Sequence, residues 1–173
     1  MKVRYFNQLD ARWASVPYGT AGTVGEEGCG PVTMAMALST LTGRTHDPVE
    51  LSRWAADNRF RCEGNGSYHA LVPAAAAGYG LACRGNLSEE EIRRALASHQ
   101  LVVAIMARGH FTSDGHFILL RGIARDHRIL VADCASRARS RERWDLPLII
   151  SEARADAGAG GPFWAIGRIK ASR

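Results

Sequence analysis

The chain has 173 residues, of which 46% are hydrophobic and 23% charged, and its formal net charge is +5 at pH 7. This length suffices to bury a core without disulfide bonds, and the composition is that of an ordinary globular protein, so we expect one domain over residues 1–173. The four cysteines contain no CxxC pair, which leaves neither a zinc knuckle nor a disulfide framework readable. We therefore expect no metal and no cofactor.

Positive charge is spread along the chain, with one local cluster at Arg137, Arg139, Arg141 and Arg143. No aromatic ladder accompanies this cluster, so it predicts a solvated loop and not a nucleic-acid surface. No segment approaches the ~20 apolar residues of a membrane span. The first residues lack the apolar region of a signal peptide, which predicts a cytoplasmic protein if the chain is full-length and a secreted or periplasmic one if a leader was removed. The oligomeric state stays open.

The first forty residues predict an arm, a loop and a helix. Residues 3–18 are rich in aromatic and turn-forming types without a helical period, so an ordered arm should pack on the body. Residues 19–28 predict a flexible loop that leads to Cys29. A helix should then cover residues 31–41 and stop at Gly43, because proline suits the first turn of a helix and glycine its C-terminal cap.

Three more helices are predicted from their N-terminal caps. Asp47, followed by proline, caps a helix that reaches about residue 58. Ser67 caps a third helix that runs through Ala77. Ser88 and Glu91 form a capping box for a fourth helix. Ile92, Ala95, Leu96 and His99 should fall on one face of this fourth helix.

From residue 101 onward the sequence changes to strand patterns. A continuous apolar run predicts a buried central strand, and two later runs separated by a turn predict a hairpin. A short helix behind Pro147 precedes the last strand. The predicted strands cover residues 81–83, 101–106, 116–121, 128–133 and 163–169. Helices first and antiparallel strands afterwards argue for an α+β fold.

Cys29 has the surroundings of a reactive thiol. It lies between Gly28 and Gly30 at a helix start, where free N–H groups and the helix dipole favour the thiolate. The two glycines leave the sulfur unobstructed and let a substrate backbone come close. A small buried cysteine beside a helix cap is the alternative interpretation.

Two residues of the predicted hairpin complement this cysteine. His116 opens one strand and Asp133 closes its partner. If the strands pair without a bulge around an even-length loop, both side chains point to the same face of the sheet. A carboxylate beside an imidazole fixes its tautomer and stabilises its charged form, which is the task of the third member of a Cys-His-Asp triad. Taken singly, each residue is more simply a strand residue without a catalytic task.

Four blocks of the sequence follow one another over nearly the whole chain: Asn7–Trp13, Gly28–Pro31, Gly115–Gly122 and Val131–Asp133. Together they resemble the double-glycine leader peptidase type of papain-like cysteine peptidase, especially its stand-alone bacterial branch. The resemblance implies a papain-like α+β fold, in which an N-terminal helical part with the nucleophile helix packs on a C-terminal antiparallel sheet. The active-site cleft would lie between the two parts.

The resemblance also implies roles for single residues. Cys29 would be the nucleophile, His116 the base and later the acid, and Asp133 the residue that orients His116. The side chain of Gln8 and the backbone N–H of Cys29 would form the oxyanion hole. The family often has proline after the aspartate, where this chain has Cys134. Nothing in the sequence resembles the membrane or ATP-binding part of a transporter, so an export-coupled role does not follow.

The predicted activity is hydrolysis of a peptide or isopeptide bond through an acyl-thioester, with a peptide as the partner and neither nucleic acid nor a membrane. Three alternatives remain. A cell-wall amidase or endopeptidase acting on peptidoglycan would fit the positive net charge. A catalytically silent peptide-binding module could keep the fold, and acyl transfer to an amine could replace hydrolysis.

Two further expectations concern residues near the site. Cys134, next to Asp133, could be sensitive to oxidation. A loop at residues 109–115, with His110 and Asp114, could form a mobile rim of the cleft.

Overall fold

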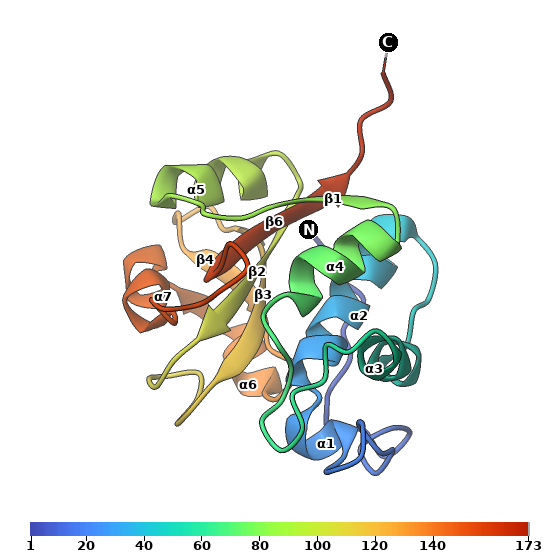
Figure 1. Ribbon diagram of the computed structural model, residues 1–173. Helices are drawn as coiled ribbons and strands as arrows, with labels where there is room; N and C mark the ends of the chain where they lie inside the picture. Colours follow the sequence, from blue (N-terminus) through green and yellow to red (C-terminus); the bar gives the residue numbers. More distant parts are fainter. Residues whose placement is uncertain (173) are drawn as a thin grey trace.

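A computed structural model describes residues 1–172 and shows one six-stranded antiparallel sheet with helices on both of its faces (Figure 1). The helices are α1 Val24–Glu27, α2 Cys29–Thr42, α3 Pro48–Asp57, α4 Leu71–Gly78, α5 Glu89–Ala97, α6 Arg137–Arg141 and α7 Leu146–Glu152. The strands are β1 Leu81–Arg84, β2 Leu101–Met106, β3 His116–Ile123, β4 Ile129–Ala132, β5 Arg143–Trp144 and β6 Phe163–Arg168. Across the sheet they lie in the order β1-β6-β2-β3-β4-β5.

The sheet separates two hydrophobic cores. On one face, α2 and α4 pack against Val103 and Ile105 of β2; on the other, α5 and α7 pack against Val102 and Ala104. Every residue of β2 is buried, which explains why this strand is a continuous apolar run instead of an alternating one. Helix α2 is also apolar around its circumference, because it lies between the sheet and α3 and α4.

The hairpin of β3 and β4 contains a β-bulge that the sequence prediction leaves out. Near the turn Gly122 pairs with Leu130, but beyond the bulge Leu120 pairs with Val131. This shift by one residue changes which side chains share a face of the sheet. Without it Asp133 would be in register with the face opposite to His116, so the bulge at Arg121 is what brings the two residues to the same face.

The approach to Cys29 is helical, which corrects the predicted flexible loop at residues 19–28. Helix α1 forms there because Thr23 and Glu26 make a capping box. Helix α2 then begins at Cys29 itself, two residues before the predicted start at Pro31. The predicted stop at Gly43 is confirmed, since this residue adopts the left-handed conformation with φ of 74°.

Other element boundaries divide into confirmed and corrected predictions. Asp47 caps α3, and Ser88 with Glu91 caps α5. Ser67 does not cap α4, which starts only at Leu71; its hydroxyl is 2.5 Å from that of Tyr18. His99 lies beyond the end of α5 and is exposed, so it does not belong to the buried face.

The predicted solvated loop of arginines is wrong in its structure. Three of the four residues, Arg137, Arg139 and Arg141, belong to α6, and Arg143 belongs to β5. Helix α6 is capped by Ser136, whose side chain accepts a hydrogen bond from the N–H of Arg139. This short helix was not predicted, because it is too short to show a helical period and gains its contacts from β4.

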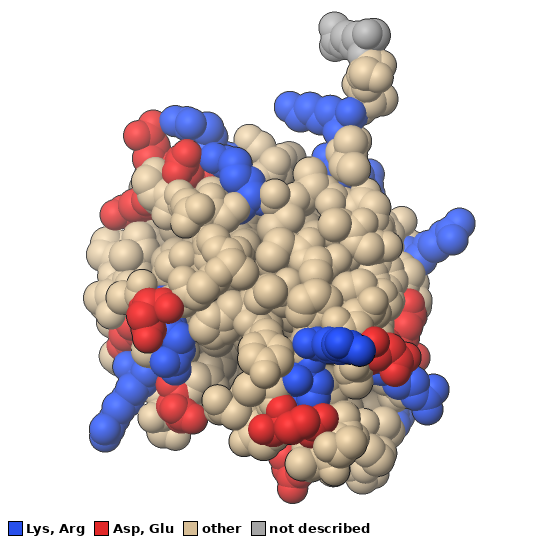
Figure 2. All heavy atoms as spheres, in the orientation of Figure 1, with Lys and Arg blue, Asp and Glu red and all other residues tan. Residues whose placement is uncertain are grey.

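Charged side chains of both signs alternate around the rim of the face shown in Figure 2, and the centre of that face carries few of them. This face therefore offers no continuous basic surface to a polyanion. Among residues 1–172, no helix combines the length and the apolar character that a bilayer span requires.

One buried cation connects the segments around the N-terminal end of α2. Arg61 is 6% exposed, and its guanidinium donates to the carbonyl oxygens of Tyr18 at 2.9 Å, Cys62 at 2.8 Å and Gly66 at 2.6 Å. It also pairs with the carboxylate of Glu27 in α1. Arg61 thereby joins α1 to the segment of residues 62–67, two parts of the chain that border Cys29.

We expect Arg61→Ala to lower the free energy of unfolding by about 3–5 kcal/mol, because it leaves Glu27 and several carbonyl groups without their donor. Urea denaturation followed by circular dichroism measures the change. Arg53→Ala serves as the control, since Arg53 is exposed on α3, and it should alter stability by less than about 0.5 kcal/mol. Equal denaturation midpoints for the two variants would contradict the assigned role of Arg61.

Candidate active site

Cys29 is the first residue of α2 and is partly buried. The N–H groups in the first turn of a helix have no acceptor within the helix, so they create a positive potential around the sulfur. The neighbouring glycines are required by packing. A Cβ atom on Gly28 would come within 2.6 Å of the carbonyl oxygen of Val24, and one on Gly30 within 2.8 Å of the hydroxyl of Ser67.

The thiol opens into a cavity of about 630 Å³. Cys29 and His116 both line it, together with Glu26 and Glu27 of α1 and with residues 62 and 64–69 before α4. The rest of the lining comes from more distant parts of the chain: Ile105, Asp114, Gly115, Phe117, Arg154 and Asp156. A cavity of this size accommodates a ligand of several residues.

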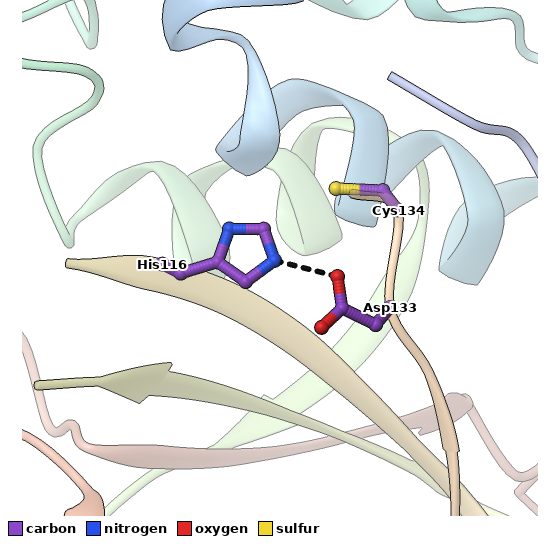
Figure 3. A group of neighbouring side chains, drawn as sticks. All are labelled: His116, Asp133 and Cys134. Atoms are coloured by element: carbon purple, nitrogen blue, oxygen red, sulfur yellow. Dashed lines mark hydrogen bonds and ion pairs between the residues drawn. The ribbon is translucent and has the colours of Figure 1, made fainter. Parts of the chain in front are cut away.

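His116 is the first residue of β3 and is 6% exposed. Its Nε2 atom lies 2.7 Å from Oδ1 of Asp133 (Figure 3). This bond leaves Nδ1 as the ring nitrogen that can serve the thiol. Burial lowers the pKa of His116, but the hydrogen bonds with Asp133 and Cys29 outweigh burial and raise the pKa to about 9. The imidazolium form therefore persists at neutral pH.

Asp133 follows β4 directly, and its side chain is fully buried. Oδ1 accepts a second hydrogen bond from the N–H of Ala135 at 2.9 Å, and Oδ2 accepts one from Nε of Arg139 at 2.6 Å. Burial alone would raise the pKa of Asp133, but the bonds to His116, Arg139 and Ala135 lower it below its ordinary value. The carboxylate is thus held ionised in a buried position.

The environment of Cys29 also favours its charged form. Burial would raise the pKa of the thiol, but the hydrogen bond and the charge of His116 outweigh this, and the N–H groups of Phe117 and Gly30 add to the effect. The net result is a pKa below that of an ordinary thiol. A thiolate beside an imidazolium can act as a nucleophile without a further base.

Cys134 lies close to His116 and Asp133 but has the opposite properties (Figure 3). Its thiol is completely buried and donates a weak hydrogen bond to Oε1 of Gln8 at 3.5 Å. Burial and the nearby charges of Cys29 and Asp133 raise its pKa well above the ordinary value. Cys134 therefore stays protonated, out of reach of a ligand in the cavity.

His116, Asp133 and Cys134 also place one ligand atom each within 4.8 Å of one another, which makes a metal site worth testing. The donor atoms do not fit one. Nε2 of His116 and Oδ1 of Asp133 are bonded to each other, and Oδ2 of Asp133 already pairs with Arg139. The Cys134 thiol would have to lose a proton that its surroundings retain.

Gln8 lies next to the segment that precedes Cys29 and is 5% exposed. Its backbone N–H donates to the carbonyl oxygen of Cys134 at 2.7 Å. Its side-chain Nε2 donates to the carbonyl oxygens of Val24 at 3.0 Å and Gly25 at 3.1 Å. Both amide hydrogens thus have acceptors, and a bond to a substrate would require the exchange of one of them.

Two further predictions concern residues around the cleft. Asp114 lines the cavity, whereas Nδ1 of His110 lies 2.5 Å from a carboxylate oxygen of Glu152 in α7.

The sequence did not predict the ion pair of Arg139 with Asp133. The only signal for it was Ser136, three residues before Arg139, as the cap of a helix that turns this arginine back toward the end of β4.

The sequence over residues 1–157 matches the model of the Peptidase_C39 like family. None of the curated proteins matches the chain significantly. A solved C39-like peptidase from Bacillus anthracis shares 17% identity, with 99% of this chain and 96% of that chain covered at a TM-score of 0.61.

Two other solved structures show the same fold. The peptidase domain of Streptococcus ComA, a bi-functional ABC transporter, shares 14% identity over 87% of this chain and 96% of its own, with a TM-score of 0.57. A double-glycine motif protease from an AMS/PCAT transporter, solved with its leader peptide, shares 17% identity over 96% of this chain and 90% of its own, at 0.54. These likenesses confirm the predicted papain-like α+β fold, and the chain belongs to the Peptidase_C39 like family.

Proposed function

We propose that the chain is a cysteine peptidase that hydrolyses a peptide bond through an acyl-thioester on Cys29. One observation carries this proposal: His116 bonds Asp133 through Nε2 and faces the Cys29 thiol within a cavity open to solvent. This arrangement supports the roles of nucleophile for Cys29, acid–base group for His116 and orienting group for Asp133.

In the proposed reaction the Cys29 thiolate attacks the carbonyl carbon of the scissile bond and forms a C–S bond. The negative charge moves to the carbonyl oxygen. When this tetrahedral intermediate collapses, the C–N bond breaks, and His116 gives the proton on Nδ1 to the leaving amine. Neutral His116 then takes a proton from water, whose oxygen attacks the thioester. The C–S bond then breaks and its electron pair returns to sulfur, which releases the acid product and restores the Cys29 thiolate and the His116 imidazolium.

The oxyanion of the tetrahedral intermediate needs donors that are already in place. The N–H of Cys29 is one candidate, because it lies in the first turn of α2. Nε2 of Gln8 is the second candidate, after it exchanges its bond to Val24 or Gly25 for one to the substrate. Hydrogen bonding from the Cys134 thiol to Oε1 of Gln8 favours the orientation in which Nε2 faces the α1 side.

A peptide is the substrate class that the cavity and the relatives favour. One neighbour of the same fold was solved with a leader peptide. The cavity of about 630 Å³ around Cys29 has room for several peptide residues. Peptidoglycan-derived peptides and isopeptides carry the same scissile group, so purified cell wall forms a second arm of the assay.

We expect the wild-type protein to cleave members of a mixed peptide library and Cys29→Ala to cleave none, because the variant lacks the atom that forms the thioester. Mass spectrometry of the products measures cleavage. Cys134→Ala removes the other thiol near His116 and should retain most of the activity. Cleavage by Cys29→Ala, or binding without turnover by the wild-type protein, would refute the proposal.

The same assay has an expected pH dependence. The active form contains both the thiolate and the imidazolium. As the pH rises through about 9, His116 loses its proton and can no longer protonate the leaving amine, so kcat/KM should fall above that pH. An alkaline limb near 6.5, the ordinary pKa of histidine, would show that Asp133 and Cys29 do not stabilise the imidazolium.

Iodoacetamide should alkylate Cys29 rapidly at neutral pH, well below the ~8.5 at which a free thiol ionises. Cys134 should stay unmodified until the protein is unfolded, because it is fully buried and protonated. Peptide mapping after brief labelling distinguishes the cysteines. In His116→Ala the reaction of Cys29 should need a higher pH, and equal labelling of Cys29 and Cys134 in the folded protein would argue against the assignment of the nucleophile.

We expect Gln8→Ala to reduce kcat by about 10²–10³ with little change in KM, the signature of a donor that acts on the transition state. Steady-state kinetics on the best peptide of the library gives both constants. Gln100→Ala is the matched control, since Gln100 is the other glutamine of the chain and packs near Gly167, away from the cavity. Equal kcat in Gln8→Ala and the wild-type protein would exclude Gln8 from the oxyanion hole.

A further inference from the structure

Helix α6 is built around Asp133. Its cap residue Ser136 accepts the N–H of Arg139 at 3.0 Å, and the carbonyl oxygen of Arg139 accepts the indole N–H of Trp144 at 3.0 Å. Ser140 bonds Asp133 from the same helix, accepting its N–H at 2.8 Å. The position of the Arg139 main chain relative to Asp133 is therefore fixed by contacts that do not involve the Arg139 side chain.

The side chain of Arg139 completes this arrangement. Nε of Arg139 donates to Oδ2 of Asp133 at 2.6 Å, while Oδ1 of the same carboxylate faces His116. The Arg139 side chain is 27% exposed and that of Asp133 is fully buried. An exposed ion pair contributes little, but this pair lies at the edge of a buried site, where solvent screens it less.

We propose that Arg139 acts on His116 through Asp133: its guanidinium, bonded to Oδ2, neutralises part of the carboxylate charge and so limits how strongly Asp133 retains the proton on the imidazole. The catalytic meaning of this role rests on the proposed peptidase activity. The ion pair itself does not depend on that activity.

Charged and titratable groups reach His116 from several elements. Cys29 approaches from α2, and Asp133 and Cys134 approach from the end of β4. Asp114, Arg154 and Asp156 line the same cavity as His116. Tyr5 contacts the group only through Asp133, whose carbonyl oxygen accepts a hydrogen bond from the Tyr5 hydroxyl at 2.7 Å. Arg139 is the arginine that bonds the Asp133 carboxylate directly. It opposes the field with which Asp133 stabilises the imidazolium.

The orientation of the carboxylate should survive the loss of Arg139. The N–H of Ala135 holds Oδ1, and Ser140 and Tyr5 hold the main chain of Asp133. Removal of the guanidinium should therefore change mainly the charge around the carboxylate. Without the opposing cation the imidazolium becomes more stable, and the pKa of His116 rises by about one unit.

The test compares Arg139→Gln with Arg141→Gln. Both remove one positive charge from α6, and Arg141 is exposed and makes no side-chain hydrogen bond or ion pair within residues 1–172. The proton chemical shift of the His116 ring, followed by NMR across pH and assigned with His116→Ala, reports the pKa directly. Arg139→Gln should shift the midpoint upward by about one unit, and Arg141→Gln should leave it within about 0.2 units.

An unchanged or lowered midpoint in Arg139→Gln would overturn the proposal, because Arg139 would then be irrelevant or would act only as a mechanical brace. Arg139→Lys supplies a second variant, since it keeps the charge but not the planar guanidinium. It should return the midpoint to within about 0.3 units of the wild-type value. A shift in Arg139→Lys of more than about 0.3 units, in either direction, counts against the charge effect, even where Arg139→Gln does not fold.

This readout separates the proposal from the proposed function. A protein that cleaves no peptide would still show the shifted titration if Arg139 acts as inferred. A peptidase with an unshifted His116 in Arg139→Gln would retain its activity assignment and refute the role of Arg139.

Discussion

The buried hydrogen bond between His116 and Asp133 is the interaction on which the rest of the site depends. A carboxylate is expensive to bury unless its oxygens are bonded to donors, and here each oxygen has at least one. The N–H of Ala135 and the guanidinium of Arg139 serve this need together with the imidazole. Because His116 bonds Asp133 through Nε2, its other ring nitrogen, Nδ1, is left free of that bond.

Three features of the fold bring the residues of this site together. The bulge near Arg121 moves the register of β3 and β4 by one residue and brings Asp133 to the face of His116. Helix α6 turns back over the end of β4 and carries Arg139 and Ser140 to the carboxylate. Helix α2 brings its N-terminal residue Cys29 to the same place from the core that it shares with Ala132 and Cys134. The position of the site is thus the meeting point of elements that are distant in sequence.

The sequence predicted those parts that depend on local chemistry. A cap residue followed by a favourable first turn identified α3 and α5, and a continuous apolar run identified β2, because caps and burial act within a few residues. The bulge and α6 were not predictable in the same way. A bulge has no strong composition signal in this hairpin, and α6 has five residues without a buried side chain, so its contacts with β4 decide its structure.

The same limit applies to the assignment of Arg139. Arg139 belongs to a run of four arginines, and the composition of that run is typical of a solvated segment. The backbone turns back after Asp133, and this turn gives Arg139 its buried partner. Sequence spacing placed Cys29, His116 and Asp133 in complementary roles. It could not show that Gln8 already donates both amide hydrogens to Val24 and Gly25, because those acceptors become neighbours only in the folded chain.

Charge balance explains how so polar a group of side chains can be accommodated beside two hydrophobic cores. In the thiolate–imidazolium form, Cys29, His116, Asp133 and Arg139 alternate in sign along the chain of contacts and sum to zero. Each charge then has an opposite neighbour, which offsets the cost of removing it from water. Cys134 lies beside this series without taking part in it, since a second anion next to Cys29 and Asp133 would break the alternation, and its pKa is raised for that reason as well as by burial. The two thiols near His116 therefore differ in the direction of their pKa shifts: the pKa of Cys29, which neighbours the imidazolium, is lowered, and the pKa of the buried Cys134, which neighbours two anions, is raised.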